Sequence, residues 1–187
     1  TDPLAAFFTP RMPWMYVHMV NASLISVALL VAGVSAYIVW KKRDAAAWNA
    51  ALRLAVLILL VSAPLQAVHG DAYGRHVADT QPQKFAAMEA HYETGTADLH
   101  LLAFPKSPDA ITDPKAENLF TVSLPGVGSF LASGGDFDAE VLGLNAYEEN
   151  PPVALVFWSF RFMVGLGFLF IGLALWGGYL LYRGRLG

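Results

Sequence analysis

Three long apolar segments constrain this chain more than any other feature of its sequence. Trp14–Trp40 contains no Asp, Glu, Lys or Arg, and it exceeds the roughly 20 residues that a helix needs to cross the hydrocarbon core of a bilayer. A second segment runs from about Trp48 to Val68, and a third, Val153–Tyr182, is interrupted only by Arg161. We therefore predict an all-α membrane protein with three transmembrane helices.

The composition supports lipid contact and excludes several classes of protein. Of the 187 residues, 56% are hydrophobic and only 14% are charged, whereas a soluble domain carries about 25% charged residues. Because the chain has no Cys, disulfides, thiolate metal sites and Cys-linked haem are excluded. The net charge of −3 gives no basic patch for a nucleic acid, so we expect no nucleic-acid partner.

The distribution of charge predicts how the chain is oriented in the membrane. The segment 69–152 is acidic, whereas the short loop 41–47 and the C-terminal tail carry Lys and Arg. Basic loops stay on the cytoplasmic side, so the N-terminus and the long segment are predicted to face outward. The predicted organisation is two transmembrane helices in residues 1–68, an extracytoplasmic loop over 69–152, and a third helix with a cytoplasmic tail over 153–187.

Within the loop, the sequence predicts a short amphipathic helix from Pro82 to about Thr94. Proline suits the first position of a helix, and Gly95 can end it. Phe85, Met88 and Tyr92 would then form an apolar stripe along one face.

The rest of the loop, residues 96–150, is rich in Gly, Pro and Asp. In this part we predict only one short strand, Phe120–Leu124. Long segments without strong elements are typically functional or flexible.

His18 and Met163 are candidate axial ligands of a haem. Each lies in an apolar segment, and imidazole and thioether are common ligands of haem iron. If Trp14 and Trp158 mark the outer aromatic belt, the two residues lie at similar depths, about 6 and 7.5 Å below it at 1.5 Å per residue. The alternatives are a polar bridge between helices for His18 and ordinary packing for Met163.

Arg161 is the most costly residue in the predicted membrane helices. A charge within such a helix usually has a partner or a function, and none of the three apolar segments contains Asp or Glu. Its partner must therefore come from the loop, from another chain, or from an anionic ligand such as a haem propionate. The alternative is an arginine that snorkels to the membrane interface.

Three segments together resemble subunit I of the cytochrome bd-type quinol oxidases. GDAYGRHVADTQPQKFAAMEAHYET (70–94) is similar to the start of the quinol-binding loop of that family. MYVHMVNASLISVALLVAGVSAYIVWKKRD (15–44) resembles the preceding helix with its haem-ligating His, and FRFMVGLGF (160–168) resembles the following helix with its haem-ligating Met.

The resemblance implies a role for each candidate residue. His18 and Met163 would bind the iron of a low-spin b haem, and Arg161 would stabilise that haem. Lys84 and Glu89, which on a loop helix could otherwise form only a solvated polar face, would take part in quinol oxidation. The implied location is the bacterial inner membrane, as part of a respiratory quinol:O2 oxidoreductase.

The chain also departs from the family pattern. It has three predicted membrane helices instead of about nine, and it lacks the ligands of the oxygen-reducing site. The further haems, b and d, are expected only with the missing helices, so the partners would be quinol, subunit II and the rest of subunit I. The chain would be a segment of a longer subunit, or a split or degenerate subunit completed by another chain.

Two other functions are compatible with parts of the sequence. A b-haem subunit could pass electrons between the quinone pool and another partner without being an oxidase. A membrane anchor without a cofactor is disfavoured by Arg161 and His18 at membrane depth.

Overall fold

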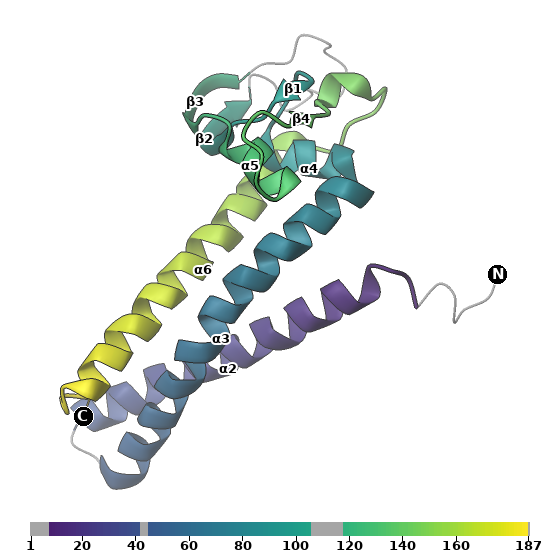
Figure 1. Cartoon of the computed structure of the whole chain (residues 1–187). Coiled ribbons are helices and arrows are strands. Elements are labelled where there is room, and N and C mark those ends of the chain that lie inside the picture. Colours follow the sequence, from purple (N-terminus) through teal and green to yellow (C-terminus); the bar gives the residue numbers. More distant parts are fainter. Residues whose placement is uncertain (1–7, 42–44, 106–117, 187) are drawn as a thin grey trace. The chain divides into compact units, whose positions relative to one another are not determined.

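The computed structural model of the chain describes residues 8–41, 45–105 and 118–186 (Figure 1). Three helices, α2 (Met12–Trp40), α3 (Ala45–Thr80) and α6 (Val153–Tyr182), are each long and apolar enough to cross a membrane. The prediction of a helical membrane protein with three transmembrane helices is therefore confirmed.

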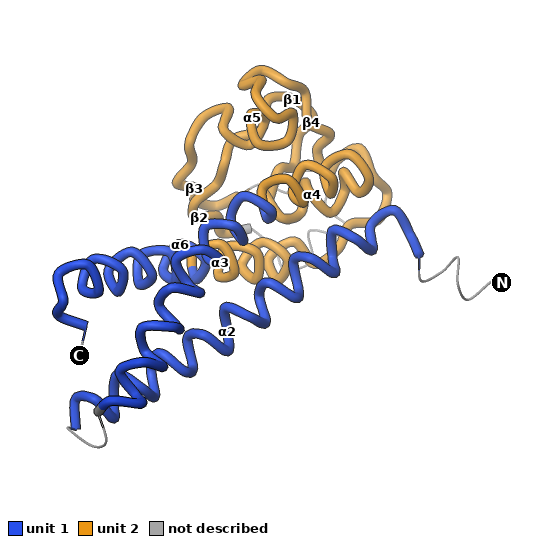
Figure 2. The backbone as a smooth tube through the Cα atoms, turned by 60° about the horizontal axis from the view of Figure 1, so that its bottom comes forward, with its two compact units in different colours: residues 1–70, 166–187 blue, residues 71–165 orange. Residues whose placement is uncertain are grey.

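The chain divides into two compact units, which Figure 2 distinguishes by colour. Unit 1 comprises Thr1–Gly70 and Leu166–Gly187, and therefore holds α2, most of α3 and most of α6. Unit 2 comprises Asp71–Gly165 and contains the elements between α3 and α6 together with the adjoining ends of those two helices.

Unit 1 is held together by small and branched apolar side chains. Its buried cluster contains residues from all three helices: Ile25, Ala28, Leu59, Ala63 and Ala174. Gly177 of α6 also allows a close approach, since a Cβ built there would lie 3.1 Å from the side chain of Val56. Small residues allow helices to pack closely in a membrane, where apolar surface alone gives no preference for protein over lipid.

Helix α3 extends beyond the membrane segment that the sequence predicts. The predicted segment ends near Val68, whereas the helix continues through Pro64 and past that point to Thr80. Residues 69–80, which the sequence analysis assigned to the loop, are therefore helical. A search for long apolar segments does not detect them, because they include acidic and basic side chains. Two of these, Asp71 and Arg75, form an i,i+4 ion pair on the helix.

Between α3 and α6, the described residues of unit 2 form seven short elements. They are α4 (Pro82–Glu89), β1 (Gly95–Thr96), β2 (Leu99–Pro105), β3 (Asn118–Leu124), α5 (Val127–Ser133), β4 (Glu140–Val141) and η1 (Leu144–Ala146). Strands β2 and β3 form one antiparallel pair, and β1 and β4 form another. The predicted strand Phe120–Leu124 lies within β3, and the predicted loop helix corresponds to α4; the other elements were not predicted.

Helix α4 ends earlier than the sequence predicts. It stops at Glu89 because Ala90 takes a left-handed backbone conformation with φ of 50°. The expectation that the helix continues to Thr94 is therefore wrong, and Tyr92 does not belong to its apolar stripe. Ala90 gave no signal of this, because a helix more often ends at Gly.

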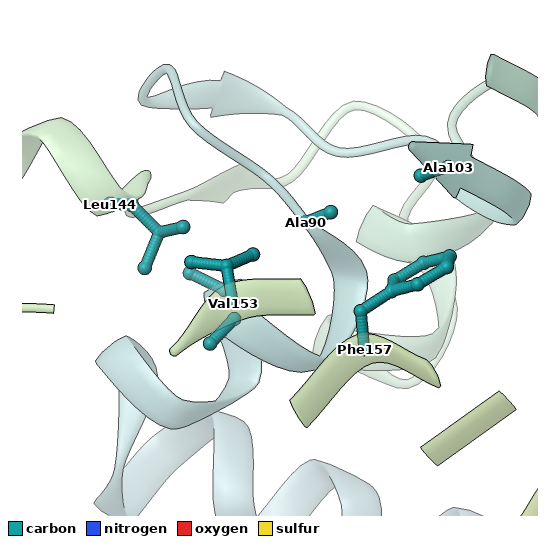
Figure 3. Packing of buried hydrophobic residues seen from close by; sticks show 7 residues of the cluster. Ala90, Ala103, Leu144, Val153 and Phe157 are labelled. Atoms are coloured by element: carbon teal, nitrogen blue, oxygen red, sulfur yellow. The ribbon is translucent and has the colours of Figure 1, made fainter. Parts of the chain in front are cut away.

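The core of unit 2 forms where α4 packs against the start of α6. Its buried cluster combines three alanines of α4 and its C-terminal end with residues from β2, η1 and α6. Figure 3 shows five of these residues by name: Ala90, Ala103, Leu144, Val153 and Phe157. The small alanine side chains leave room for the ring of Phe157, which is completely buried. This packing places the end of α4 beside α6.

Gly143, just before η1, is required for the close packing of two loop segments. A Cβ at this position would lie 2.6 Å from the backbone nitrogen of Thr94, and the backbone N–H of Leu144 donates to the carbonyl of His91 at 3.0 Å. We expect Gly143→Ala to lower the free energy of unfolding by about 1–3 kcal/mol, the usual cost of overpacking. Limited proteolysis of the loop in the purified complex would measure it.

Gly74→Ala provides the control for this prediction. Gly74 lies within α3 and has open space around the position of a Cβ, so alanine should be tolerated there. Equal protease resistance of both variants would show that the contact at Gly143 is dispensable.

Candidate functional site

The centre of the candidate site is an ion pair between Glu89 and Arg161. Glu89 is the last residue of α4, and its carboxylate Oε2 accepts a hydrogen bond from Nη2 of Arg161 on α6. Only 4% of the Glu89 side chain and 11% of the Arg161 side chain are exposed. Of the three possible partners of Arg161 that the sequence allows, the one present within unit 2 is a loop residue.

Burial makes the carboxyl of Glu89 a weaker acid than an exposed glutamate. Loss of solvation raises the pKa of its carboxyl to about 7, although the charge and hydrogen bond of Arg161 act in the opposite direction. A carboxyl with this pKa is present in both protonation states near neutral pH. That property suits a group that takes up and releases a proton during a reaction.

The guanidinium of Arg161 is held by aromatic rings as well as by Glu89. Its Cζ lies 5.0 Å from the ring centroid of Phe157 and 5.3 Å from that of Phe160. The buried Nε of Arg161 has no hydrogen-bond partner within the described residues. An arginine with a spare buried donor is suited to bind a further anionic oxygen.

Lys84 lies apart from this pair. It is on the exposed face of α4, whereas Glu89 is buried at the end of the same helix. The structure thus pairs Glu89 with Arg161, and it leaves the Lys84 ammonium accessible to solvent or to a ligand.

His18 lies on α2 in unit 1, next to the end of the predicted membrane segment of α3. Its ring centroid is 5.7 Å from that of His69, which is in turn 5.6 Å from Trp14. The backbone carbonyl of His18 accepts a hydrogen bond of 3.1 Å from Nε2 of Gln66. Sequence reasoning missed both His69 and Gln66. The helical spacing continued past Val68 would have included His69, whereas Gln66 already lies within the predicted segment and is distinguished there only by its polar side chain.

The same polar contact continues deeper between α2 and α3. Nδ2 of Asn21 donates to Oε1 of Gln66 at 2.7 Å and to the carbonyl of Ser62 at 2.9 Å. Polar side chains that bond across two membrane helices fix their register. These contacts therefore hold the backbone at His18 in a defined position.

The donor groups present fit a haem. His18 supplies an imidazole, and Met163, which is 49% exposed, supplies a thioether. The buried Nε of Arg161 could donate a hydrogen bond to a propionate. Within the part of the chain that the structure describes, no three His, Asp or Glu side chains could hold a metal ion by themselves. His18 belongs to unit 1 and Met163 to unit 2, so their binding of one iron stays a prediction.

Comparison with known proteins identifies the family. The sequence model of cytochrome bd terminal oxidase subunit I matches residues 1–186. The chain belongs to this family. The predicted resemblance to subunit I of the cytochrome bd oxidases is thus confirmed over nearly the whole chain.

Individual relatives support the assignment to the cytochrome bd family. The chain is 34% identical over 177 residues to a putative cytochrome bd menaquinol oxidase subunit I of Bacillus subtilis, a match that covers 91% of this chain and 38% of the relative. It is 29% identical over 198 residues to cytochrome bd ubiquinol oxidase subunit 1 of the same organism, covering 99% of this chain and 41% of the relative.

A solved structure shows the same fold. The bd oxidase from Geobacillus thermodenitrificans matches with a TM-score of 0.79 and 28% identity, over 99% of this chain and 44% of the solved one. The chain therefore spans about two fifths of the length of the cytochrome bd subunits that it matches.

Proposed function

We propose that the chain is the electron-entry part of a membrane quinol oxidase of the cytochrome bd type. Quinol would be oxidised at the outer face of the bacterial inner membrane, and its electrons would pass to a b haem bound by His18 and Met163. The observation that carries the proposal is the buried pair of Glu89 and Arg161. It joins the residue implicated in quinol oxidation to the residue implicated in haem binding.

Glu89 is the proton acceptor in this proposal. Its buried carboxyl, with a pKa of about 7, takes a proton from a quinol hydroxyl when it is ionised. Arg161 stabilises the ionised form before the transfer, and its spare Nε would be available to donate to a haem propionate. Lys84, on the exposed face of α4, positions a quinol oxygen or balances its charge.

The b haem supplies one-electron redox chemistry when it is bound, and ligation by Met and His raises its potential. The groups of this chain then have separate tasks: His18 and Met163 bind the iron, and Glu89 removes the proton. Because the loop is predicted to face outward, the protons would be released outside.

Oxygen reduction would take place elsewhere in the complex. The chain covers only part of its relatives, and the further b and d haems would be bound by the missing helices of subunit I, with subunit II as another partner. The relatives named above include both a ubiquinol and a menaquinol oxidase, and the proposal holds for either quinol.

The test is anaerobic reduction of the complex that contains this chain. Quinol should produce the reduced absorption band of a b haem, and the band should return to its oxidised form when O2 is admitted. Reduction by quinol without reoxidation by O2 would favour the electron-transfer subunit that is not an oxidase. Absence of a b-type band would leave only the anchor without a cofactor.

Met163→Leu tests the weaker of the two proposed ligands. We expect the haem to be retained with a changed spin state or reduction potential, because leucine has a similar volume but no donor atom. A redox titration monitored optically would measure the change. Met88→Leu, in a second buried cluster of unit 2 that also contains Val77 and Phe85, is the matched control and should leave the spectrum unchanged. An unaltered spectrum in Met163→Leu would contradict the assignment.

A further inference from the structure

A polar pocket opens at the end of α4, directly after Glu89. Its volume is about 370 Å³, and the side chains that line it include His91, Glu93, Asp98 and His100. Two imidazoles and two carboxylates thus surround one open space in unit 2. None of these four residues has a role in the quinol and haem chemistry described above.

His100 touches the backbone of Glu89 and has a defined tautomer. Its Nδ1 lies 2.8 Å from the carbonyl oxygen of Glu89. A carbonyl oxygen can only accept a hydrogen bond, so Nδ1 of His100 carries the hydrogen and donates it. In the neutral ring, Nε2 is then the nitrogen that accepts a proton.

His91 has the same arrangement with its nitrogens exchanged. Its Nε2 lies 3.2 Å from the carbonyl oxygen of Val141 and donates to it, which leaves Nδ1 as the proton-accepting nitrogen. The residue is only 7% exposed, and burial lowers the pKa of its imidazole. Near neutral pH the ring is therefore in the neutral form that can accept a proton.

The carboxylates of Asp98 and Glu93 are further proton acceptors that line the pocket, and they extend the set of acceptors to the protein surface. Asp98 is fixed in place, because its carboxylate accepts hydrogen bonds from Oγ of Ser123 at 3.2 Å and from the backbone N–H of Gly126 at 3.0 Å. Glu93 is exposed. Arg161, the partner of the Glu89 carboxylate, is positively charged and cannot accept a proton, so a proton that leaves Glu89 needs another acceptor.

We propose that this pocket conducts the proton that Glu89 takes from quinol to the outer solution, with His100 as the first acceptor. The inference rests on the proposed function of Glu89. The proton moves from the Glu89 carboxyl, which is not among the side chains that line the pocket, through water to Nε2 of His100, while Nδ1 keeps its own hydrogen. The ring then loses the Nε2 proton to His91, Asp98, Glu93 or water. No electrons move in these steps, and each group returns to its starting state.

His100→Gln in the complete oxidase complex tests the proposal. Glutamine has an amide N–H that can donate to the Glu89 carbonyl, but it does not take up a proton. We expect quinol oxidation to slow by about tenfold, less than the roughly 10²–10⁴-fold effect of a primary proton acceptor, because water offers a slower bypass. Electron entry from a small artificial donor that carries no proton should be unchanged.

Rescue by added imidazole separates proton transfer from a structural role. If His100→Gln fails because proton transfer is lost, a mobile base in the pocket should restore most of its quinol activity. If it fails because the packing is disturbed, added imidazole should not restore the activity. His76→Gln, at a histidine of α3 that is not among those lining the pocket, is the matched control and should behave as the wild type.

Three outcomes would overturn the proposal for the pocket. They are wild-type quinol activity in His100→Gln at every pH, a loss that imidazole does not rescue, and equal losses with quinol and with the artificial donor. A wild-type complex that does not oxidise quinol would overturn the proposed function instead, so the two failures are distinguishable.

Discussion

Glu89→Gln is expected to slow quinol oxidation by about 10²–10⁴-fold, the usual contribution of a positioned general base. Glutamine keeps the shape of the side chain and can still accept a hydrogen bond from Arg161, but it cannot take up the proton. The b-haem spectrum should change little, because Glu89 pairs with Arg161 and is not a proposed iron ligand. Steady-state quinol oxidation by the purified complex measures the effect.

Two controls identify the cause of such a loss. A small artificial electron donor bypasses quinol, so its rate should be nearly unchanged in Glu89→Gln. Glu148→Gln, at an exposed loop carboxylate, should leave both rates unchanged. Equal losses with both donors would mean that the haem or the fold was damaged. Full quinol activity in Glu89→Gln would show that the carboxylate is not the proton acceptor.

The pH dependence of the rate gives an independent check on Glu89. A general base works in its ionised form, so wild-type activity should rise as pH increases through about 7, the pKa of Glu89. This rise should be missing from the residual activity of Glu89→Gln. The same raised pKa has the opposite effect on stability: its contribution is complete below the unfolded pKa near 4.5 and is lost as pH increases through about 7.

The three helices could be predicted because the bilayer imposes a simple requirement on sequence. A long apolar segment with few charges can be recognised directly in the sequence. Helices α2 and α6 begin and end close to the ends of the apolar segments that predicted them. The extension of α3 to Thr80 could not be found in the same way, because residues outside the membrane need not be apolar. The end of α4 at Ala90 depends on tertiary packing, which places a non-glycine residue in a left-handed conformation.

The site was predictable as a set of residues but not as an arrangement. The cost of a charge in a membrane helix identified Arg161, and the family resemblance identified Glu89. These two residues are 72 positions apart, and no local pattern indicates that they form a pair. The pocket that follows α4 was missed for the same reason: the tautomers of His91 and His100 are set by hydrogen bonds to the carbonyl groups of Val141 and Glu89, which no local pattern indicates.

His18→Ala is expected to abolish the low-spin b-haem signal completely. Removing the imidazole removes one of the two proposed axial ligands, and alanine offers no donor in its place. The helices should still insert and pack, because the contact of Gln66 is made with the backbone carbonyl of His18, which alanine retains. A reduced-minus-oxidised spectrum of the purified complex would show the loss of the b band.

His69→Ala is the decisive control for His18→Ala, since the two rings lie side by side with centroids 5.7 Å apart. Loss of the low-spin signal in the His18 variant with its retention in the His69 variant would support the assignment of His18. The reverse result would move the ligand to α3, and an intact b band in His18→Ala would refute the assignment outright. Because both substitutions remove one imidazole from the same region of unit 1, a general weakening of the helix packing should affect both variants alike. Only a bond to iron predicts a difference between them.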